Sequence, residues 1–311
     1  MMKKQTIVAI ACAYLCLLVT PGVASASGDG ILLLAHGGKP EWNERVNAVA
    51  AALDAERPVA VAFGMATRPA IQAAVDRLTA RGVSRIVAVP LFVSSHSSVV
   101  TSTEYLLGLR SDLPPALKRF ARMTHGHGGA HAAHDSSADD PEANLRPIQS
   151  PVPVVMTEAL NAHPLVADIL LSRATAMSQA PDREAVILVA HGPVDDDDNA
   201  RWLADMRRLA ERIGSQASFA SIDYLTVRDD APAAIRDKAT AELRALVERR
   251  TGEGRRVLIV PLLLTYGGIE EGIRKRLAGL EYTMAAQALL PDDRIQAWVR
   301  AAAASKGGAT R

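Results

Sequence analysis

Short runs of apolar residues alternate with amphipathic stretches along most of the chain. The runs, such as "ILLLA" at 31–35 and "VILVA" at 186–190, are apolar throughout and do not alternate with polar residues. Between them, stretches such as 41–55 repeat apolar residues three and four positions apart, which is the period of a helix packed on a core. Apolar runs without alternation predict parallel strands covered on both faces, and the intervening helices predict an α/β fold with right-handed crossovers.

The same order of runs and helical stretches occurs twice. "GILLLAHGGKP" at 30–40 corresponds to "AVILVAHGPVD" at 185–195, and "AVPLFV" aligns without a gap on "IVPLLL". Each unit ends in a strand, a short loop and a helix. Such self-similarity indicates a repeated structural unit. We therefore expect two tandem flavodoxin-like domains over residues 30–178 and 184–305, each a parallel sheet of four or five strands with helices on both faces.

A histidine follows the first apolar run of each unit, at His36 and His191. In a flavodoxin-like sheet, strands one and three flank the point where the strand order reverses, and ligands bind there beyond the carboxyl ends. His96, in "PLFVSSHSS", follows the third run of the first unit. We therefore expect His36 and His96 to face one cleft, where two imidazoles suit a divalent cation or proton abstraction near neutral pH. The alternative is that His36 only ends its strand and His96 lies in solvent.

The second unit keeps half of this arrangement. The alignment of "VPLFVSSH" with "VPLLLTYG" places Gly267 opposite His96, so we expect a degenerate second domain in which His191 serves structure or substrate contact. Four aspartates at 195–198 precede the next helix, and we expect them to cap its N-terminus and favour its dipole, with a cation site beside His191 as the alternative. We expect His163 to be a helix-entry residue, although it also lies near the end of the last strand.

A His-rich insert lies between the third and last strands of the first unit, at 124–150. Its glycines, small residues and charges leave it nothing to bury, so we expect a flexible loop. Neutral imidazoles on a pliable backbone can converge on one metal ion, which predicts metal capture, with a merely solvated loop as the alternative. These imidazoles belong to His125, His127, His131 and His134.

The first 26 residues have the features of a secretory signal peptide. Lys3 and Lys4 precede an apolar run over 7–19, and "ASA" at 24–26 fits a cleavage site. The run is shorter than the ~20 residues that span a bilayer, so we expect export to the periplasm without membrane association after cleavage. Both cysteines of the sequence lie in this segment, which leaves the mature chain without disulfides or thiolate ligands.

Charge and composition argue against a nucleic-acid partner. The chain has 35 basic and 34 acidic residues, and aromatic residues that stack on bases are few. Nothing in the sequence predicts a particular oligomeric state.

The phrases "LLAHGG", "FGMATRPAIQAAVDRL", "GVSRIVAVPLFVSSHSS" and "ALNAHPLVADIL" resemble those of the CbiX-type sirohydrochlorin chelatases, the class II chelatases. The resemblance covers nearly all of the first unit and, more loosely, the second. It implies a tandem chelatase (lyase) that inserts Co2+, or in relatives Fe2+ or Ni2+, into a carboxylate-rich tetrapyrrole. It also implies that His36 and His96 are the metal-binding and catalytic residues. Lys39, Arg45 and Arg68 can meet the substrate's carboxylates, although we expect most of them on solvated helix faces.

Two features favour a different function. Many relatives have a glutamate four residues before the proline of "ATRPAIQ", where this chain has Met65. Tetrapyrrole synthesis is normally cytoplasmic, whereas this chain carries an export signal. The sequence therefore supports two functions. One is a sirohydrochlorin cobaltochelatase-like protein that uses Co2+, with Ni2+, Fe2+ or Zn2+ as other candidates. The other is an exported protein that binds, stores or delivers divalent metal without chelatase turnover.

Overall fold

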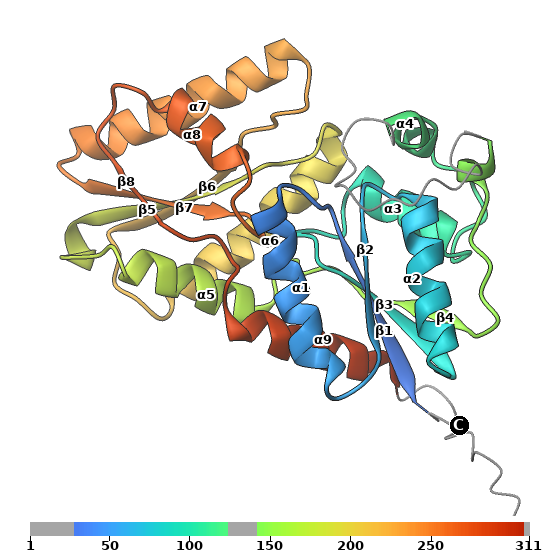
Figure 1. Ribbon diagram of the computed structural model, residues 1–311. Helices are drawn as coiled ribbons and strands as arrows, with labels where there is room; N and C mark the ends of the chain where they lie inside the picture. The colour runs from blue at the N-terminus through green and yellow to red at the C-terminus, as the bar shows by residue number, and fades with distance from the viewer. Residues whose placement is uncertain (1–27, 124–141, 308–311) are drawn as a thin grey trace, which may run out of the picture.

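A computed structural model describes residues 28–123 and 142–307 of the chain (Figure 1). Within these residues the strands form two four-stranded parallel sheets, which confirms the expected fold. The first sheet has the order β2-β1-β3-β4 and contains β1 (Asp29–Ala35), β2 (Val59–Phe63), β3 (Arg85–Pro90) and β4 (Val154–Met156). The second has the order β6-β5-β7-β8 and contains β5 (Glu184–Ala190), β6 (Ser221–Thr226), β7 (Arg256–Leu262) and β8 (Thr283–Met284).

Helices connect the strands, because parallel pairing needs a crossover between neighbours. The first unit contains α1 (Pro40–Asp54), α2 (Arg68–Ala80), α3 (Ser98–Leu106), α4 (Pro115–Met123) and α5 (Pro164–Thr175). The second contains α6 (Asp196–Gly214), α7 (Ala233–Gly252), α8 (Ile269–Arg276) and α9 (Asp293–Gly307). Short 3₁₀ turns lie at η2 (Ala143–Leu145) and η3 (Pro181–Arg183).

Each central strand is buried on both faces, which explains its unbroken apolar run. In β1, Leu32 and Leu34 belong to a core formed with α2, α3 and α4, whereas Ile31 and Leu33 belong to a core on the opposite face. In β5, Ile187 and Val189 likewise belong to a separate core with α7 and α8. The remaining faces of the two sheets contribute to a single apolar cluster that both units share.

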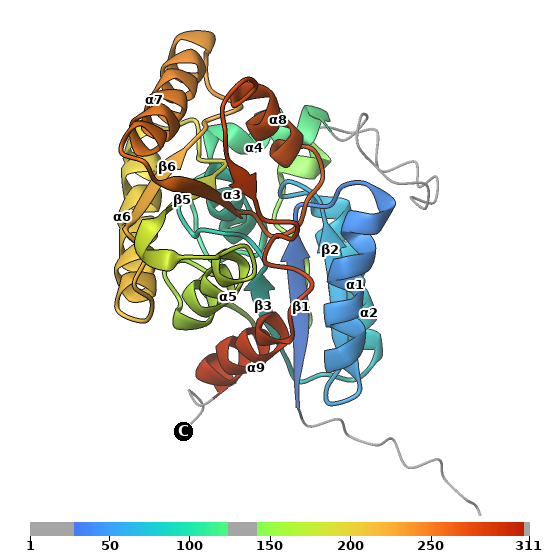
Figure 2. The ribbon, with the colours of Figure 1, turned by 90° about the vertical axis from the view of Figure 1, so that its left-hand side faces the viewer.

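The shared core is closed by an exchange of helices between the units (Figures 1 and 2). Helix α5, the last of the first unit, packs against β7 of the second sheet and against α6. Helix α9, the last of the second unit, packs against β3 of the first sheet and against α1. Trp298 and Val299 of α9 are buried in the shared core. The sequence units 30–178 and 184–305 thus exchange their final helices, an arrangement that the repeat pattern did not predict.

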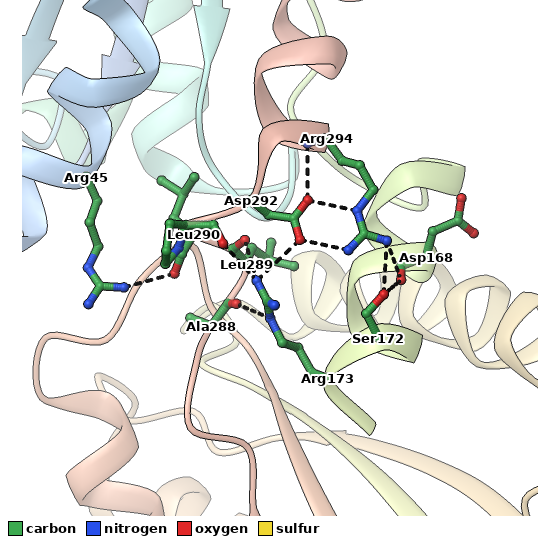
Figure 3. A network of polar contacts seen from close by, with 10 residues as sticks. Arg45, Asp168, Ser172, Arg173, Ala288, Leu289, Leu290, Asp292 and Arg294 are labelled. Carbon is green, nitrogen blue, oxygen red and sulfur yellow. Dashed lines mark hydrogen bonds and ion pairs between the residues drawn. The ribbon is translucent and has the colours of Figure 1, made fainter. Parts of the chain in front are cut away.

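Polar contacts hold the segment that leads into α9, residues 288–292 (Figure 3). Arg173 of α5 donates hydrogen bonds to the carbonyl oxygens of Ala288, at 2.9 Å, and Pro291, at 3.0 Å, and it also pairs with Asp292. Arg294 forms a second ion pair with Asp292, at 2.7 Å. Burial raises the pKa of the Asp292 carboxyl, but the hydrogen bonds from Arg294 and the positive charges of Arg294 and Arg173 together outweigh burial, so the pKa lies below its ordinary value. The segment before α9 is therefore tied to α5, the last helix of the first unit.

Several predicted features lie outside the described residues. They are the signal peptide at 1–26 and the four histidines His125, His127, His131 and His134. Among the helices that are described, none has the length and apolar character of a membrane span.

Candidate metal site at the strand ends

The predicted site lies at the carboxyl edge of the first sheet. Strands β1 and β3 are parallel neighbours in register, with Leu34 beside Pro90, and this is the point where the strand order reverses. His36 directly follows β1, and His96 lies in the loop between β3 and α3. The expected topology therefore brings both histidines to adjacent strand ends, where parallel α/β sheets bind ligands.

His36 is exposed, and its ring is held by its own turn. Its Nδ1 lies 2.8 Å from the carbonyl oxygen of Gly37. Because a carbonyl oxygen only accepts, Nδ1 is the donor, and in the neutral ring Nε2 keeps a free lone pair. Metal-binding histidines commonly donate their second ring N–H to such an acceptor. Gly37 adopts a left-handed φ of 79°, and a Cβ there would lie 3.2 Å from Cβ of Phe63, so a side chain would strain this turn.

His96 is half-buried in a loop that the second unit helps to fix. The backbone N–H of His96 donates to Oγ of Ser94 at 3.1 Å. The backbone carbonyl of His96 accepts a hydrogen bond from the indole Nε1 of Trp202 at 2.6 Å. Ser97 then caps α3 by accepting from the N–H of Val100. With the described residues the imidazole itself makes no hydrogen bond, so both ring nitrogens remain available.

Two aspartates of α6 interact electrostatically with His96. Asp198 and Asp205 lie on the same face of α6 as Trp202, at positions i, i+7 and i+4. Burial raises the pKa of both aspartates, and the positive charge of His96 opposes that rise in each case. Glu158, which follows β4, raises the pKa of Asp205 further. The positive charges of Arg201 and Arg208 act on the same aspartates, so the charge beside this loop is mixed.

Among the described residues, the pair of histidines has no third strong ligand of the usual kind. Across residues 28–123 and 142–307, no three His, Cys, Asp or Glu side chains are grouped closely enough to hold a metal ion. Met65, where many chelatases have a glutamate, packs instead against the core on the α2 side of the first sheet. Arg45 and Arg68 donate to the carbonyl oxygens of Leu290 and Arg146, so their guanidinium groups contact backbone.

The corresponding edge of the second sheet is built differently. Nε2 of His191 lies 3.4 Å from Oδ2 of Asp230, and the alignment partner of His96 is Gly267. The buried Arg228 fills the adjacent turn, where it donates to the carbonyl oxygen of Pro193 and pairs with Asp196 at 2.6 Å. At the carboxyl edge of the second sheet, these side chains therefore contact other residues of the second unit.

Two expectations about helix starts are confirmed. Oδ1 of Asp195 accepts a hydrogen bond from the N–H of Asp198 at 3.0 Å and so caps α6. Nδ1 of His163 accepts from the N–H of Leu165 at 3.2 Å and caps α5. Burial lowers the pKa of His163, which keeps the ring neutral and able to accept.

Sequence reasoning missed the contribution of the second unit to the first site. An indole N–H that reaches a carbonyl 106 positions away leaves no pattern in the sequence. Asp205 does leave a signal, because an acidic residue on the buried face of an amphipathic helix is unusual. Its neighbours on that face, Trp202, Met206 and Leu209, are all buried.

Comparisons with known proteins agree on one family. Residues 30–177 match the family model described as CbiX. The sirohydrochlorin cobaltochelatase of Methanothermobacter thermautotrophicus is 35% identical over 83 residues, which cover 26% of this chain and 58% of that protein. The chain therefore spans little more than half the length of this curated relative.

Two solved structures share the fold over almost the whole chain. Sirohydrochlorin chelatase SirB from Bacillus subtilis subspecies spizizenii, in complex with cobalt, has a TM-score of 0.56 at 14% identity. SirB from Bacillus subtilis with Fe3+ has a TM-score of 0.57 at 16% identity. Both comparisons cover 91% of this chain and 98% of the other.

Proposed function

Because residues 30–177 match the CbiX family model, we propose that the protein inserts a divalent metal ion into a sirohydrochlorin-type tetrapyrrole. The observation that carries the proposal is the position of His36 and His96 after adjacent parallel strands. The partial match to a sirohydrochlorin cobaltochelatase supports Co2+ as the first ion to test, with Ni2+, Fe2+ and Zn2+ as other candidates.

The residues fit the chemical needs of insertion. The tetrapyrrole loses two pyrrole N–H protons and gains one divalent ion, so the site must release a metal and accept protons. Nε2 of His36 has a free lone pair because Nδ1 donates to Gly37. Two neutral imidazoles suit a divalent first-row ion, and the described residues add no closed ligand cage, which leaves the ion exchangeable. An imidazole that has given up the metal accepts a proton near neutral pH.

A second candidate function is supported by Met65. Its thioether side chain is partly buried and packs against an apolar core, and this position supplies no carboxylate for metal or proton transfer. A protein that captures and delivers divalent metal needs the histidine pair but no turnover. For this function the stretch with His125, His127, His131 and His134 adds binding capacity.

For either function we propose that the protein is exported to the periplasm. The support is the basic start, apolar run and "ASA" site of the first 26 residues. Fractionation followed by intact mass measurement tests this: the periplasmic protein is expected to lack residues 1–26. A full-length mass in the cytoplasm would contradict export.

The two functions separate in one absorption experiment. Purified mature protein is mixed with Co2+ and sirohydrochlorin, and the macrocycle's absorption is followed against a protein-free control and a variant that lacks residues 124–137. A chelatase accelerates insertion, and each protein molecule acts repeatedly. Tight Co2+ binding with an insertion rate equal to the control would exclude the chelatase and leave metal capture. Loss of that binding only in the deletion variant would move the metal site to the His-rich stretch.

A further inference from the structure

Each of the two sheets ends in edge strands, which pair with a neighbour on one side only. Such a strand leaves the N–H and C=O groups of every second residue without a ladder partner, and proteins usually cover or shorten these edges. Two of the four described edge strands are short, because β4 has three residues and β8 has two. The longer edge strands β2 and β6 occupy equivalent positions, each beside the first strand of its own sheet.

The edge of β2 is covered by side chains of its own unit. The N–H of Val59 donates to Oδ1 of Asp54 at 2.7 Å, and the guanidinium of Arg77 donates to the carbonyl oxygen of Val61 at 3.0 Å. Arg81 pairs with Asp54 and also donates to the carbonyl oxygen of Val59, at 3.4 Å. Another strand cannot pair with these backbone groups without displacing the side chains that hold them.

The edge of β6 has no such cover. This strand is six residues long and pairs with β5 on one side. Among the described residues, no side chain makes a hydrogen bond with the backbone of residues 221–226. Asp223, the charged residue of the strand, is paired with Arg250 at 2.7 Å, so its charge is balanced within its own chain. β6 is therefore an open edge of ordinary length, which can pair with a strand of another chain.

A groove of about 360 Å³ lies beside this edge, between β6 and α6. Half-buried apolar side chains line it, and they belong to Phe219, Ile222 and Tyr224. In Figure 2, α6 lies on the side of the molecule away from α2. An added strand gains affinity from backbone hydrogen bonds and specificity from pockets for its alternate side chains. The open edge and the groove beside it provide both.

The rim of the groove carries charges of both signs. Arg207 and Glu211 lie one turn apart on α6, and their side chains are 60% and 68% exposed. A second copy of α6 in antiparallel orientation presents these two residues in the reverse order, so unlike charges meet. A two-fold axis through Asp223 also sets Ile222 of one copy opposite Tyr224 of the other, an aliphatic–aromatic pair that stabilises antiparallel strands. The surface is therefore complementary to itself, as a two-fold interface requires.

We propose that two copies of this chain associate through β6, with the two strands antiparallel, so that their four-stranded second sheets become one continuous sheet. The groove of each copy is then covered by α6 and β6 of the other. The equivalent edge of the first unit is closed by Asp54, Arg77 and Arg81, so the association stops at two copies. This inference uses the second unit alone and does not depend on the proposed metal chemistry.

The first test measures association and locates it. Analytical ultracentrifugation of the purified mature protein is expected to show a monomer–dimer equilibrium as the concentration rises. Hydrogen exchange followed by mass spectrometry is expected to show slower exchange of the amides of 219–226 at high protein concentration, with no change at 59–63. A monomer at every concentration, or a dimer that leaves the exchange of 219–226 unchanged, would overturn the proposal.

The second test reverses the charges on the rim. Glu211→Arg is expected to weaken dimerisation about tenfold, because two exposed ion pairs across the axis are replaced by repulsion. Arg207→Glu combined with Glu211→Arg exchanges the two charges and is expected to restore association. Glu242→Arg on α7 is the matched control, since it breaks a similar exposed pair, with Lys238 at 3.9 Å, and should leave association unchanged.

Equal association constants for wild type, the two groove variants and the control would contradict this interface. Slower exchange at 219–226 that appears only when a different protein is added would refute self-association and assign the edge to that partner.

Discussion

The indole Nε1 of Trp202 donates a hydrogen bond of 2.6 Å to the backbone carbonyl of His96. Trp202 belongs to the second unit and His96 to the first, so the loop that carries a proposed metal ligand is fixed from the other half of the molecule. The second unit has glycine at the position of His96. The absence of a second histidine at this position is therefore compatible with a supporting role of the second unit for the first site.

Removing this hydrogen bond tests that role. Trp202→Phe keeps an aromatic ring in the shared core but leaves the carbonyl of His96 without its donor. We expect a stability loss of about 1 kcal/mol, typical of one hydrogen bond, together with weaker Co2+ binding. Urea unfolding and a Co2+ titration measure the two effects. Trp298→Phe is the matched control, since Trp298 is a buried tryptophan of the same shared core on α9, and it should leave Co2+ affinity unchanged. Equal Co2+ affinity in the two variants would contradict the account.

The contacts of Arg173 should stabilise the exchanged helices. The side chains of Arg173 and Asp292 are only 15% and 11% exposed. Arg173→Ala therefore leaves a buried carboxylate with one ion pair and three carbonyl oxygens without this donor. We expect a loss of about 3 kcal/mol in the free energy of unfolding, as for other broken buried pairs. Urea-induced unfolding measures it. Arg300→Ala removes an exposed ion pair with Glu56 between α9 and the segment after α1, and little change is expected there. Similar midpoints for the two variants would show that residues 288–292 are held by other contacts.

His163 predicts a pH dependence of stability. Burial lowers its pKa in the folded protein, whereas in the unfolded chain the ring takes up a proton near pH 6.5. The unfolded state therefore binds more protons below pH 6.5, and stability falls as the pH decreases from there through the folded pKa. Above pH 6.5 the contribution is complete. His163→Asn retains a capping acceptor that does not titrate.

Urea midpoints of wild type and His163→Asn between pH 8 and pH 5 check this sign. The two curves are expected to run in parallel above pH 6.5 and to converge or cross below it, because only wild type loses its cap. Curves that stay parallel down to pH 5 would show that His163 does not titrate between the two states.

The sheets and the histidine pair could be predicted because their signals are local. Unbroken apolar runs such as 31–35 indicate burial on both faces, and the order of strands follows from repeated crossovers. The capping roles of Asp195 and His163 were predicted for the same reason, since a cap acts on the next few residues. His36 and His96 reach one sheet edge because β1 and β3 are neighbours.

The exchange of α5 and α9 could not be predicted from the sequence. Both helices have apolar faces, and both sheets offer a similar apolar surface, so each helix can pack on either sheet. The choice depends on contacts between distant residues, such as Arg173 with Ala288. The approach of Trp202 to His96 follows from that arrangement and was missed for the same reason. The orientation of the His36 ring depends on a hydrogen bond to the backbone carbonyl of Gly37. Because every residue has a backbone carbonyl, the sequence does not reveal this hydrogen bond.

The most direct measurement compares Co2+ insertion into sirohydrochlorin by wild type, His36→Ala, His96→Ala and His191→Ala. The account predicts that loss of either His36 or His96 lowers the insertion rate by about 10²-fold or more, the scale of a lost acid–base or metal-holding group. His191→Ala removes the equivalent histidine of the second unit and should keep the wild-type rate within a small factor. Equal rates for all four proteins, or a loss confined to His191→Ala, would contradict a metal site between His36 and His96.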